Sequence, residues 1–312
     1  METTADDLVT TKAAMATVPL LARHDVEACT IERLYGLTNR VYRVDTPDGS
    51  YCLRVPGVGT EGFIDRSVEK VNAAAAARAG VSPEVLHYGD DAVMVTPFLG
   101  DTTTMSPALL QSTPGAATRA GKAFHKLHTS GETFDFRFEL FAMIDDYLVH
   151  LDKLGVTEFP EGYHDLVQQA GAMRDALSSH DLPLAACHCD PMCENMLDDG
   201  NTMWIIDWEY SGMNDPMWDL GDFSVEAGFD DAKDSEMMTA YFGRSPTAFE
   251  QGRMVLYKAL CDLLWTLWGL IQHANKNPAE DFWAYSEERF ARCKALMSKP
   301  GFGDHIAAVK AG

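Results

Sequence analysis

Short runs of β-branched and aromatic residues, alternating with polar ones, occupy much of the first 97 positions. Such runs predict β-strands. The turn sequence Thr46-Pro47-Asp48-Gly49 joins two of them, so the strands on either side are expected to form a hairpin. One alanine-rich stretch predicts a helix that ends at Gly80. The expected strands are 31–35, 41–46, 51–55, 84–88 and 92–96, and the expected helix is 65–79.

Beyond Pro97, apolar residues recur at the three- and four-residue spacing of amphipathic helices. Two short strand-like pieces, 184–187 and 203–206, interrupt this pattern, and each leads into a cluster of polar residues. The pattern therefore predicts an α+β chain with a β-rich N-terminal lobe at 1–97 and a helical C-terminal lobe at 98–312. The expected helices are 116–127, 138–151, 163–177 and 248–273.

Composition and charge narrow the functional classes. The chain has 312 residues, of which 46% are hydrophobic and 23% charged, as in an ordinary globular protein. The 25 lysines and arginines against 47 aspartates and glutamates leave a net charge of −22. A surface this acidic repels nucleic acid and anionic lipid, so neither is an expected partner.

Location is predicted from the apolar runs and the cysteines. The longest apolar stretches, such as 263–271, fall short of the roughly 20 residues that span a bilayer, so no membrane insertion is expected. The first residues are acidic, unlike a secretory signal. The 7 cysteines are an odd number spread along the chain, which favours reduced thiols and a cytoplasmic location.

The strongest chemical signal follows the expected strand at 184–187. His188, Asp190 and Asn195 form an H-x-D-x-x-x-x-N pattern, and Asp207 follows the next expected strand. Phosphoryl transfer from ATP needs a carboxylate that takes the proton of the acceptor hydroxyl, and oxygen ligands that hold Mg²⁺ on the phosphates. Asp190 suits the first role. Asn195 and Asp207 suit the second, because a hairpin between their segments would bring an amide oxygen and a carboxylate to one ion.

Two other interpretations of this segment are weaker. A chance match to a short pattern is disfavoured by the strand context and by Asp207. A zinc site is suggested by four neighbours, Cys187, His188, Cys189 and Cys193, but structural zinc usually takes ligand pairs from two separated places, and no second Cys/His pair at zinc-knuckle spacing exists. Small buried cysteines beside a functional loop are the better interpretation.

Several segments, in a consistent order over about residues 31–297, resemble the choline/ethanolamine kinase family, within the aminoglycoside-phosphotransferase-like and protein-kinase-like folds. The resemblance implies a two-lobed protein-kinase-like fold that binds ATP between the lobes near 96–99. The matching segments are Asp207-Trp208-Glu209-Tyr210-Ser211 (D-[FYW]-E-Y-[SA] in the family), Trp218-Asp219-Leu220-Gly221-Asp222 followed by Glu226 (F-D-[IL]-G-N and a later glutamate), Leu264-Trp265-Thr266-Leu267-Trp268-Gly269 (F-W-x-L-W) and Tyr285-Ser286-Glu287-Glu288-Arg289-Phe290 (Y-x-x-x-R-F).

The resemblance also implies nucleotide-binding residues. Thr38 and Asn39 stand in a segment similar to the family loop G-G-x-[ST]-N, although Tyr35 replaces the first glycine and weakens the phosphate cradle. Arg54 corresponds to a basic residue that contacts phosphate, and Glu69 would be its ion-pair partner. Taken alone, these two residues are also compatible with an exposed strand position and a solvated helix face.

Trp265 and Trp268 are three residues apart, so their indoles project from the same side of one helix. Core packing is the commoner role of such a pair. The resemblance implies instead that they and Tyr285 surround the quaternary ammonium of choline, with Glu226 as the nearby carboxylate. Ethanolamine has three N–H donors and would need more acceptors, so the aromatic set favours choline.

The sequence thus predicts an ATP- and Mg²⁺-dependent kinase that phosphorylates the hydroxyl of choline. The alternatives are a related kinase for ethanolamine, thiamine or an aminoglycoside, and a catalytically silent choline-binding protein, which the intact Asp190, Asn195 and Asp207 disfavour. His125 and His128 could suggest a metal pair, but their segment resembles an L-H-x-L-H helix in which a structural role is expected.

Overall fold

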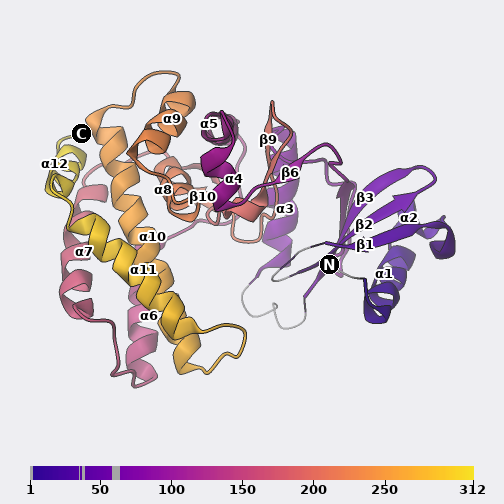
Figure 1. Ribbon diagram of the computed structural model, residues 1–312, viewed down its shortest axis with the longest axis horizontal. Coiled ribbons are helices and arrows are strands. Elements are labelled where there is room, and N and C mark those ends of the chain that lie inside the picture. The colour runs from indigo at the N-terminus through magenta and orange to yellow at the C-terminus, as the bar shows by residue number, and fades with distance from the viewer. Residues whose placement is uncertain (1–2, 35, 37–38, 58–63) are drawn as a thin grey trace.

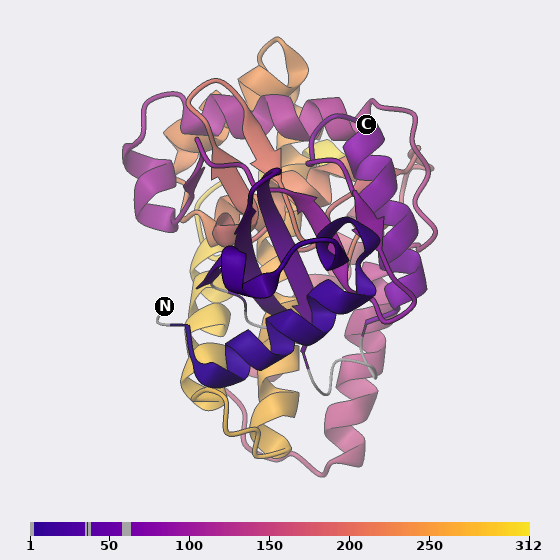
Figure 2. The same ribbon diagram turned by 90° about the vertical axis from the view of Figure 1, so that its right-hand side faces the viewer.

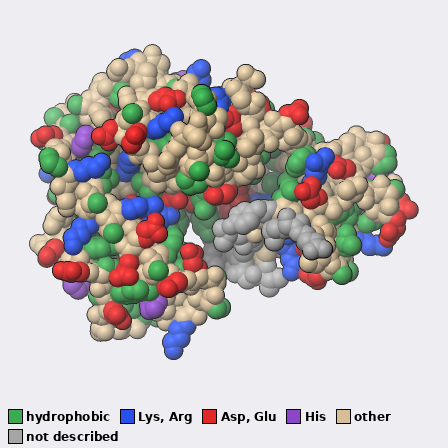
Figure 3. Space-filling model, viewed as in Figure 1, with side chains coloured by type: hydrophobic (Ala, Val, Ile, Leu, Met, Phe, Trp, Pro, Cys, Tyr) green, Lys and Arg blue, Asp and Glu red, His purple; other side chains and the backbone are tan. Residues whose placement is uncertain are grey.

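Two lobes of different secondary structure make up the molecule (Figure 1 and Figure 3). The computed structural model describes residues 3–34, 36, 39–57 and 64–312. The smaller lobe holds a five-stranded antiparallel sheet in the order β1-β2-β3-β5-β4, and the larger lobe is mostly helical. The β-rich N-terminal part and the helical C-terminal part expected from the sequence are both present.

The sheet is built on the hairpin that the turn sequence predicts. β2 and β3 pair without interruption from Asn39 opposite Pro56 to Thr46 opposite Gly49. The first and fourth strands are shorter than predicted, because pairing in β1 ends at Arg33 and β4 contains two residues. The strands are β1 (Thr30–Arg33), β2 (Asn39–Thr46), β3 (Gly49–Pro56), β4 (His87–Tyr88) and β5 (Met94–Pro97).

The outer face of this sheet is covered by a helix that the sequence pattern did not predict. Figure 2 shows α1 (Ala5–Thr17) lying across the strands, and its Met15 is buried in the same apolar cluster as Tyr42 and Leu53. Only two of its four buried residues are apolar, so it lacks the broad apolar stripe by which such a helix is found in a sequence. Two short helices follow it, α2 (Pro19–Ala22) and η1 (Val26–Ala28).

The inner face of the sheet, opposite α1, carries the charged residue Arg54. Side chains alternate along a strand, so Leu53 enters the apolar core while its neighbour Arg54 points to the opposite face. α3 (Arg66–Arg78), which corresponds to the predicted helix at 65–79, contributes Glu69 to that same face. Arg54 and Glu69 thus meet between the sheet and α3.

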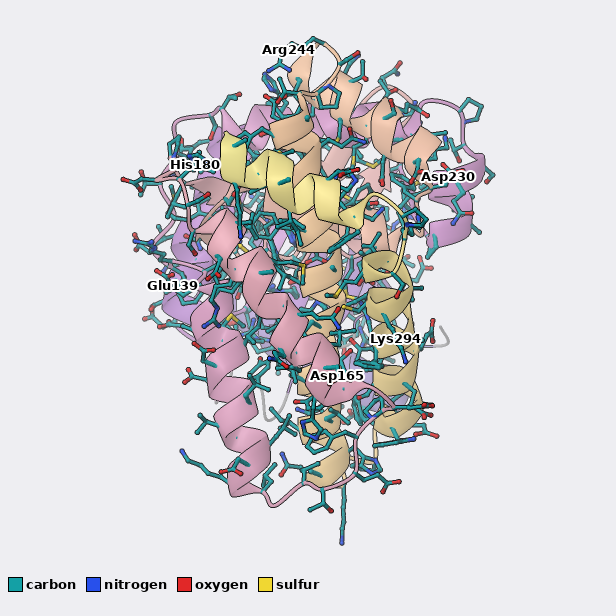
Figure 4. All side chains as sticks on the ribbon, turned by 90° about the vertical axis from the view of Figure 1, so that its left-hand side faces the viewer. Glu139, Asp165, His180, Asp230, Arg244 and Lys294 are labelled. Carbon is teal, nitrogen blue, oxygen red and sulfur yellow. The ribbon has the colours of Figure 1, made fainter. Side chains whose placement is uncertain are left out.

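The helical lobe is organised around α10 (Ala248–Ala274), which packs against α6, α8, α11 and α12 (Figure 4). α10 is long and apolar enough to cross a membrane, but 78% of its most apolar window is buried inside the lobe, as in a core helix. The other helices are α4 (Pro107–Ser112), α5 (Ala116–His128), α6 (Leu140–Lys153), α7 (Tyr163–Leu177), α8 (Pro216–Glu226), α9 (Asp231–Phe242), α11 (Phe282–Met297) and α12 (Phe302–Ala311).

Two glycines let neighbouring helices approach α10 closely. A Cβ on Gly221 of α8 would lie 2.9 Å from the Met254 carbonyl oxygen, and one on Gly269 would collide with Ser286 of α11. Both glycines belong to segments that resemble the kinase family. Their smallness brings the inner sides of α8, α10 and α11 together where the acceptor residues are expected.

Short strands occupy the part of the helical lobe nearest the sheet. β7 pairs with β10, and β8 pairs with β9 and β6. The segment after β7 carries Asp190, and the ends of the β8–β9 hairpin carry Asn195 and Asp207. The bounds are β6 (Thr103–Thr104), β7 (Ala185–Cys187), η2 (Cys193–Asn195), β8 (Met196–Asp198), β9 (Met203–Ile205) and β10 (Gly212–Asn214).

Candidate active site

A buried carboxylate fixes the backbone of the loop that carries Asp190. Asp219 of α8 is fully buried and accepts hydrogen bonds from the backbone N–H groups of His188, at 2.7 Å, and Cys189, at 2.9 Å. The Trp218 indole N–H donates to the Cys189 carbonyl at 3.1 Å. Cys189 itself has φ +68°, a conformation that a non-glycine residue keeps only when its surroundings hold it.

His128 also contacts the Asp219 carboxylate. Its Nε2 lies 3.0 Å from Asp219 Oδ2, and its Nδ1 lies 3.0 Å from the Tyr241 hydroxyl. Helices α5, α8 and α9 therefore converge on one anchor beneath the loop. His125 is exposed, so the two histidines do not form a metal pair, and the structural role expected for their helix is the better one.

Changing Asp219 to Asn should loosen this anchor. The amide keeps the shape but turns an N–H₂ group toward one of the two backbone N–H donors, so at least one buried donor loses its acceptor. We expect a loss of about 2–3 kcal/mol, or roughly 5 °C in Tm. A shift of the loop by about 1 Å would also lower kcat by up to ~100-fold.

Thermal unfolding and steady-state kinetics of Asp219→Asn check this expectation. Asp175→Asn is the matched control, because Asp175 is an exposed aspartate on α7. Wild-type Tm together with wild-type kcat for Asp219→Asn would show that the loop does not depend on this carboxylate.

Asp190 lies half-buried in the loop that Asp219 anchors. Burial raises the pKa of its carboxyl to about 7, and the nearby negative charge of Glu226 adds to the effect, while Arg289 opposes it. A carboxylate with a raised pKa holds a proton more strongly than an ordinary aspartate does. Asp190 is therefore suited to accept a proton near neutral pH.

The β8–β9 hairpin brings Asn195 and Asp207 together, as the sequence predicts. The Ile206 N–H donates to the Asn195 carbonyl oxygen at 3.0 Å, so Asp207, the next residue, lies beside Asn195. The Asn195 side chain donates through Nδ2 to the Asp190 carbonyl at 3.3 Å, which leaves its amide oxygen for another partner. Burial and the charge of Glu209 raise the pKa of Asp207, and Arg54 opposes them. This pair of hard oxygen donors fits Mg²⁺.

Arg54 on β3 of the smaller lobe contacts Asp207 in the larger lobe. It forms the expected ion pair with Glu69, and its Nη1 lies 3.3 Å from Asp207 Oδ1. The residue is 4% exposed, yet its Nε and Nη2 have no hydrogen-bond partner in the described ranges. Buried donors without a partner are costly, and a phosphate oxygen would satisfy them.

A second arginine, to which sequence reasoning assigned no role, completes this network. Arg66 Nη1 lies 2.9 Å from both Glu69 Oε2 and Glu209 Oε1, and its Nη2 donates to the Asn39 side-chain oxygen at 3.2 Å. Asn39 in turn donates to Glu209. The structure thus places Asn39 in a polar contact between the lobes, while Thr38 lies outside the described residues. The spacing of Arg66 three residues before Glu69 was the available signal.

The three aromatic residues expected around the acceptor form one cluster. The ring centroids of Trp265 and Trp268 are 6.0 Å apart, and those of Trp268 and Tyr285 are 5.8 Å apart, both edge to face. All three side chains are half-buried, whereas Trp218 is fully buried. A half-buried aromatic cluster has open ring surface, so it fits a binding wall better than a sealed core.

Two carboxyl groups stand one turn apart on α8 beside this cluster. Glu226 accepts a hydrogen bond from Arg289 at 2.5 Å and is therefore already paired with a cation. Asp222 accepts from the Cys261 thiol at 3.2 Å, and its other oxygen has no partner in the described part of the chain. Neither Asp222 nor Arg289 was assigned a role from the sequence, although both stand in segments that resemble the kinase family.

The structure disfavours the zinc interpretation. The His188 ring points to the Ile206 carbonyl oxygen, at 2.9 Å, and the Cys187 thiol lies 3.5 Å from the Asn214 carbonyl oxygen. Within residues 3–34, 36, 39–57 and 64–312, no cluster of three potential metal-ligand atoms contains more than one of the four suggested zinc ligands. All 7 cysteines are free thiols.

Comparison with known proteins agrees with this geometry. Residues 31–242 match the family described as choline/ethanolamine kinase. The crystal structure of a choline/ethanolamine kinase family protein from Mesorhizobium loti is 56% identical, with a TM-score of 0.91 over 97% of this chain and 99% of that one. Choline kinase LicA from Streptococcus pneumoniae is 25% identical, with a TM-score of 0.74 over 93% of this chain and 100% of that one. Mouse ethanolamine kinase 1 is 23% identical over 82% of this chain and 80% of its own length. These matches confirm the two-lobed protein-kinase-like fold.

Proposed function

The chain belongs to the choline/ethanolamine kinase family, and on this basis we propose that it transfers the γ-phosphoryl group of ATP to the hydroxyl group of choline. The observation that carries the choline assignment is the half-buried cluster of Trp265, Trp268 and Tyr285. This cluster lies beside the C-terminal end of α8, because the Arg289 guanidinium lies over the Tyr285 ring and donates a hydrogen bond to Glu226.

The chemical step needs a base and an acceptor held in line with the nucleotide. As the hydroxyl oxygen of choline bonds to the γ-phosphorus, the bond from that phosphorus to the β–γ bridging oxygen breaks, and ADP leaves. The hydroxyl proton passes to the Asp190 carboxylate. The hydrogen bonds from the loop backbone to Asp219 keep the Asp190 carboxylate in place during the transfer.

The nucleotide would lie between the sheet and the helical lobe, beside β5 and residues 96–99. Arg54 would contact its phosphates through the two nitrogens that have no partner within the described residues, and Glu69 and Asp207 hold the guanidinium from the other side. Asn195 and Asp207 would hold Mg²⁺, which neutralises negative charge on the phosphates when it is bound.

Choline fits the acceptor pocket through its charge and its lack of donors. A trimethylammonium group makes no strong hydrogen bonds and is bound by aromatic faces and negative charge. Trp265, Trp268 and Tyr285 supply the faces. Glu226 lies close to Tyr285, because Arg289 contacts both, and Asp222 stands one turn earlier on α8.

Ethanolamine is the second candidate acceptor, and one observation favours it. The Asp222 oxygen without a partner among the described residues would suit an acceptor that brings an N–H donor. Several similar curated proteins are ethanolamine kinases.

A purified-enzyme assay separates these proposals. ATP consumption should be measured with choline, ethanolamine, thiamine and an aminoglycoside as acceptors, each at several concentrations. We expect choline to give the highest kcat/KM. A higher kcat/KM for ethanolamine would make ethanolamine the preferred acceptor. Turnover with neither choline nor ethanolamine would contradict both proposals.

Removing either tryptophan should weaken acceptor binding more than it weakens the fold. A desolvated cation–π contact contributes about 2 kcal/mol, so Trp265→Ala or Trp268→Ala should raise the KM for choline by roughly 30-fold. Trp→Phe at the same positions keeps much of the volume and should give a smaller increase.

Trp283→Ala is the matched control for the tryptophan variants. Trp283 is a half-buried tryptophan of α11 that packs on His273, outside the cluster. KM values and Tm should be measured for all variants. If the pair were core, Tm would fall strongly and the KM for choline would not change, because deleting a buried indole costs about 3–5 kcal/mol of stability with or without ligand.

A further inference from the structure

Arg289 of α11 stands among the residues that the proposed function assigns to the acceptor. Its Nη1 lies 2.5 Å from Glu226 Oε1 and 3.4 Å from Asp262 Oδ1, and its guanidinium carbon lies 5.2 Å from the centre of the Tyr285 ring. The side chain is 12% exposed. A permanent cation thus contacts both Glu226 and Tyr285 from inside the protein.

A buried cation beside a site for a cationic ligand has an electrostatic disadvantage, because like charges repel each other more strongly where water is excluded. Its presence therefore needs another reason. The contacts supply one, since Glu226 and Tyr285 come from different helices and Arg289 contacts both. The planar guanidinium can donate to Glu226 through Nη1 while it lies over the Tyr285 ring, which a compact ammonium group would not do.

The contact with Arg289 occupies one oxygen of Glu226 and leaves the other without a hydrogen-bond partner in the described ranges. Without this contact, the glutamate side chain could rotate about three bonds and turn its charge toward water. The ring of Tyr285, one turn before Arg289 on α11, is held in a similar way by the guanidinium at its face.

We propose that Arg289 is a positioning residue of the acceptor pocket, which holds Glu226 and Tyr285 in the orientation that binds the ammonium group of the amino alcohol. This inference rests on the proposed function. Arg289 acts through its two neighbours and does not contact the acceptor itself.

The neighbouring Arg292 provides a matched control. It lies three residues later on the same helix and forms an ion pair with the same Asp262, at 2.6 Å. Within the described residues, Arg292 makes no hydrogen bond or ion pair with Glu226 and no cation–π contact with Tyr285. Replacing either arginine by Met removes one positive charge near Asp262, but only Arg289→Met releases Glu226.

Arg289→Met tests positioning against charge by the direction of the change in KM. Positioning predicts that the KM for the better amino alcohol acceptor rises by about 10-fold, with a smaller effect on kcat and none on the KM for ATP. A role limited to repulsion predicts the opposite, because removing a cation would strengthen binding of another cation and lower KM. Arg292→Met should leave the KM for the acceptor within about twofold of wild type.

A double-mutant cycle with Glu226→Gln shows whether Arg289 acts through Glu226. In the Glu226→Gln background, Arg289→Met should raise KM much less than it does in the wild type, since the positioned charge is already absent. Arg289→Lys keeps the charge without the planar guanidinium and should give an intermediate KM. Fully additive effects, a lower KM for Arg289→Met, or equal effects of Arg289→Met and Arg292→Met would each overturn the inference.

The experiment also separates this inference from the proposed function. The wild-type enzyme with choline and ethanolamine tests the function, and only the variants test Arg289. If Arg289→Met fails to fold, the charge-neutral pair Glu226→Gln/Arg289→Met and the Arg289→Lys variant still decide the question, because each avoids an uncompensated buried charge.

Discussion

Asp190→Asn is expected to lower kcat by about 10²–10⁴-fold while the KM values for ATP and for the acceptor change little. The amide cannot take the hydroxyl proton, but it fills nearly the same volume in a loop whose backbone is fixed by Asp219. A base acts in the transition state, so its loss appears in kcat. Steady-state kinetics with the preferred amino alcohol provide the measurement.

Glu194→Gln is the matched control for this variant. Glu194 lies four residues later, is half-buried and makes no hydrogen bond or ion pair among the described residues. Glu194→Gln removes one negative charge from the same loop, as Asp190→Asn does. If Asp190→Asn kept a near-normal kcat, or if Glu194→Gln lost as much, Asp190 would not be the base.

Asp207→Ala is expected to reduce kcat/KM for the magnesium nucleotide by about 10²–10³-fold, because it removes the oxygen that we propose as a Mg²⁺ ligand, and several kcal/mol of charge stabilisation depend on a bound metal. Acceptor binding should change far less, since nothing is taken from the aromatic cluster. Asp207→Asn keeps the shape beside Arg54 and should show the same direction of change.

Asn195→Ala should reduce activity less than Asp207→Ala does, and part of the lost activity should be recoverable. It removes a neutral ligand, so a higher Mg²⁺ concentration should recover part of the activity, whereas Glu194→Gln, at the adjacent position, should show the normal Mg²⁺ dependence. Titrations of Mg²⁺ at fixed ATP, together with calorimetry of acceptor binding, measure both effects. Normal Mg²⁺ dependence in both Asp207→Ala and Asn195→Ala would show that the metal assignment is wrong.

The contacts between Arg54, Arg66, Glu69 and Glu209 explain why a substitution near them should affect both activity and stability. Side chains from the sheet, from α3 and from the segment after β9 share two arginines. Changing one acidic member leaves these arginines with fewer acidic partners, and a buried cation that loses part of its compensation lowers the stability of the fold. Losses of stability at Asp207 should therefore be measured beside losses of activity.

Local pattern was enough for part of the fold, and α4, α8, α9 and α12 are among the helices that it did not predict. Strong periodicity and turn residues predicted the β2–β3 hairpin, α3, α5, α7 and α10 to within a few residues, because in these elements the hydrophobic face and the local propensity agree. α1 was not predicted, since two of its four buried positions are the polar residues Asp7 and Thr11. Its position depends on contacts with strands that follow it in the chain.

The sequence by itself determined the chemical groups of this protein and their order: the H-x-D loop, the pair of Asn195 and Asp207, the tryptophan pair, and the family that these motifs resemble. These are local patterns, and the β8–β9 hairpin brings Asn195 and Asp207 together over a short span of chain.

The partners of those groups were decided only by the tertiary structure. Asp219 meets the loop of Asp190 from α8, Arg66 meets Glu209 across 143 positions, and Arg289 meets Glu226 across 63. No periodicity connects residues so far apart, because the contact arises only when helices pack. The physical reason is that a buried charge needs a specific partner, whereas a buried apolar side chain needs only an apolar surface.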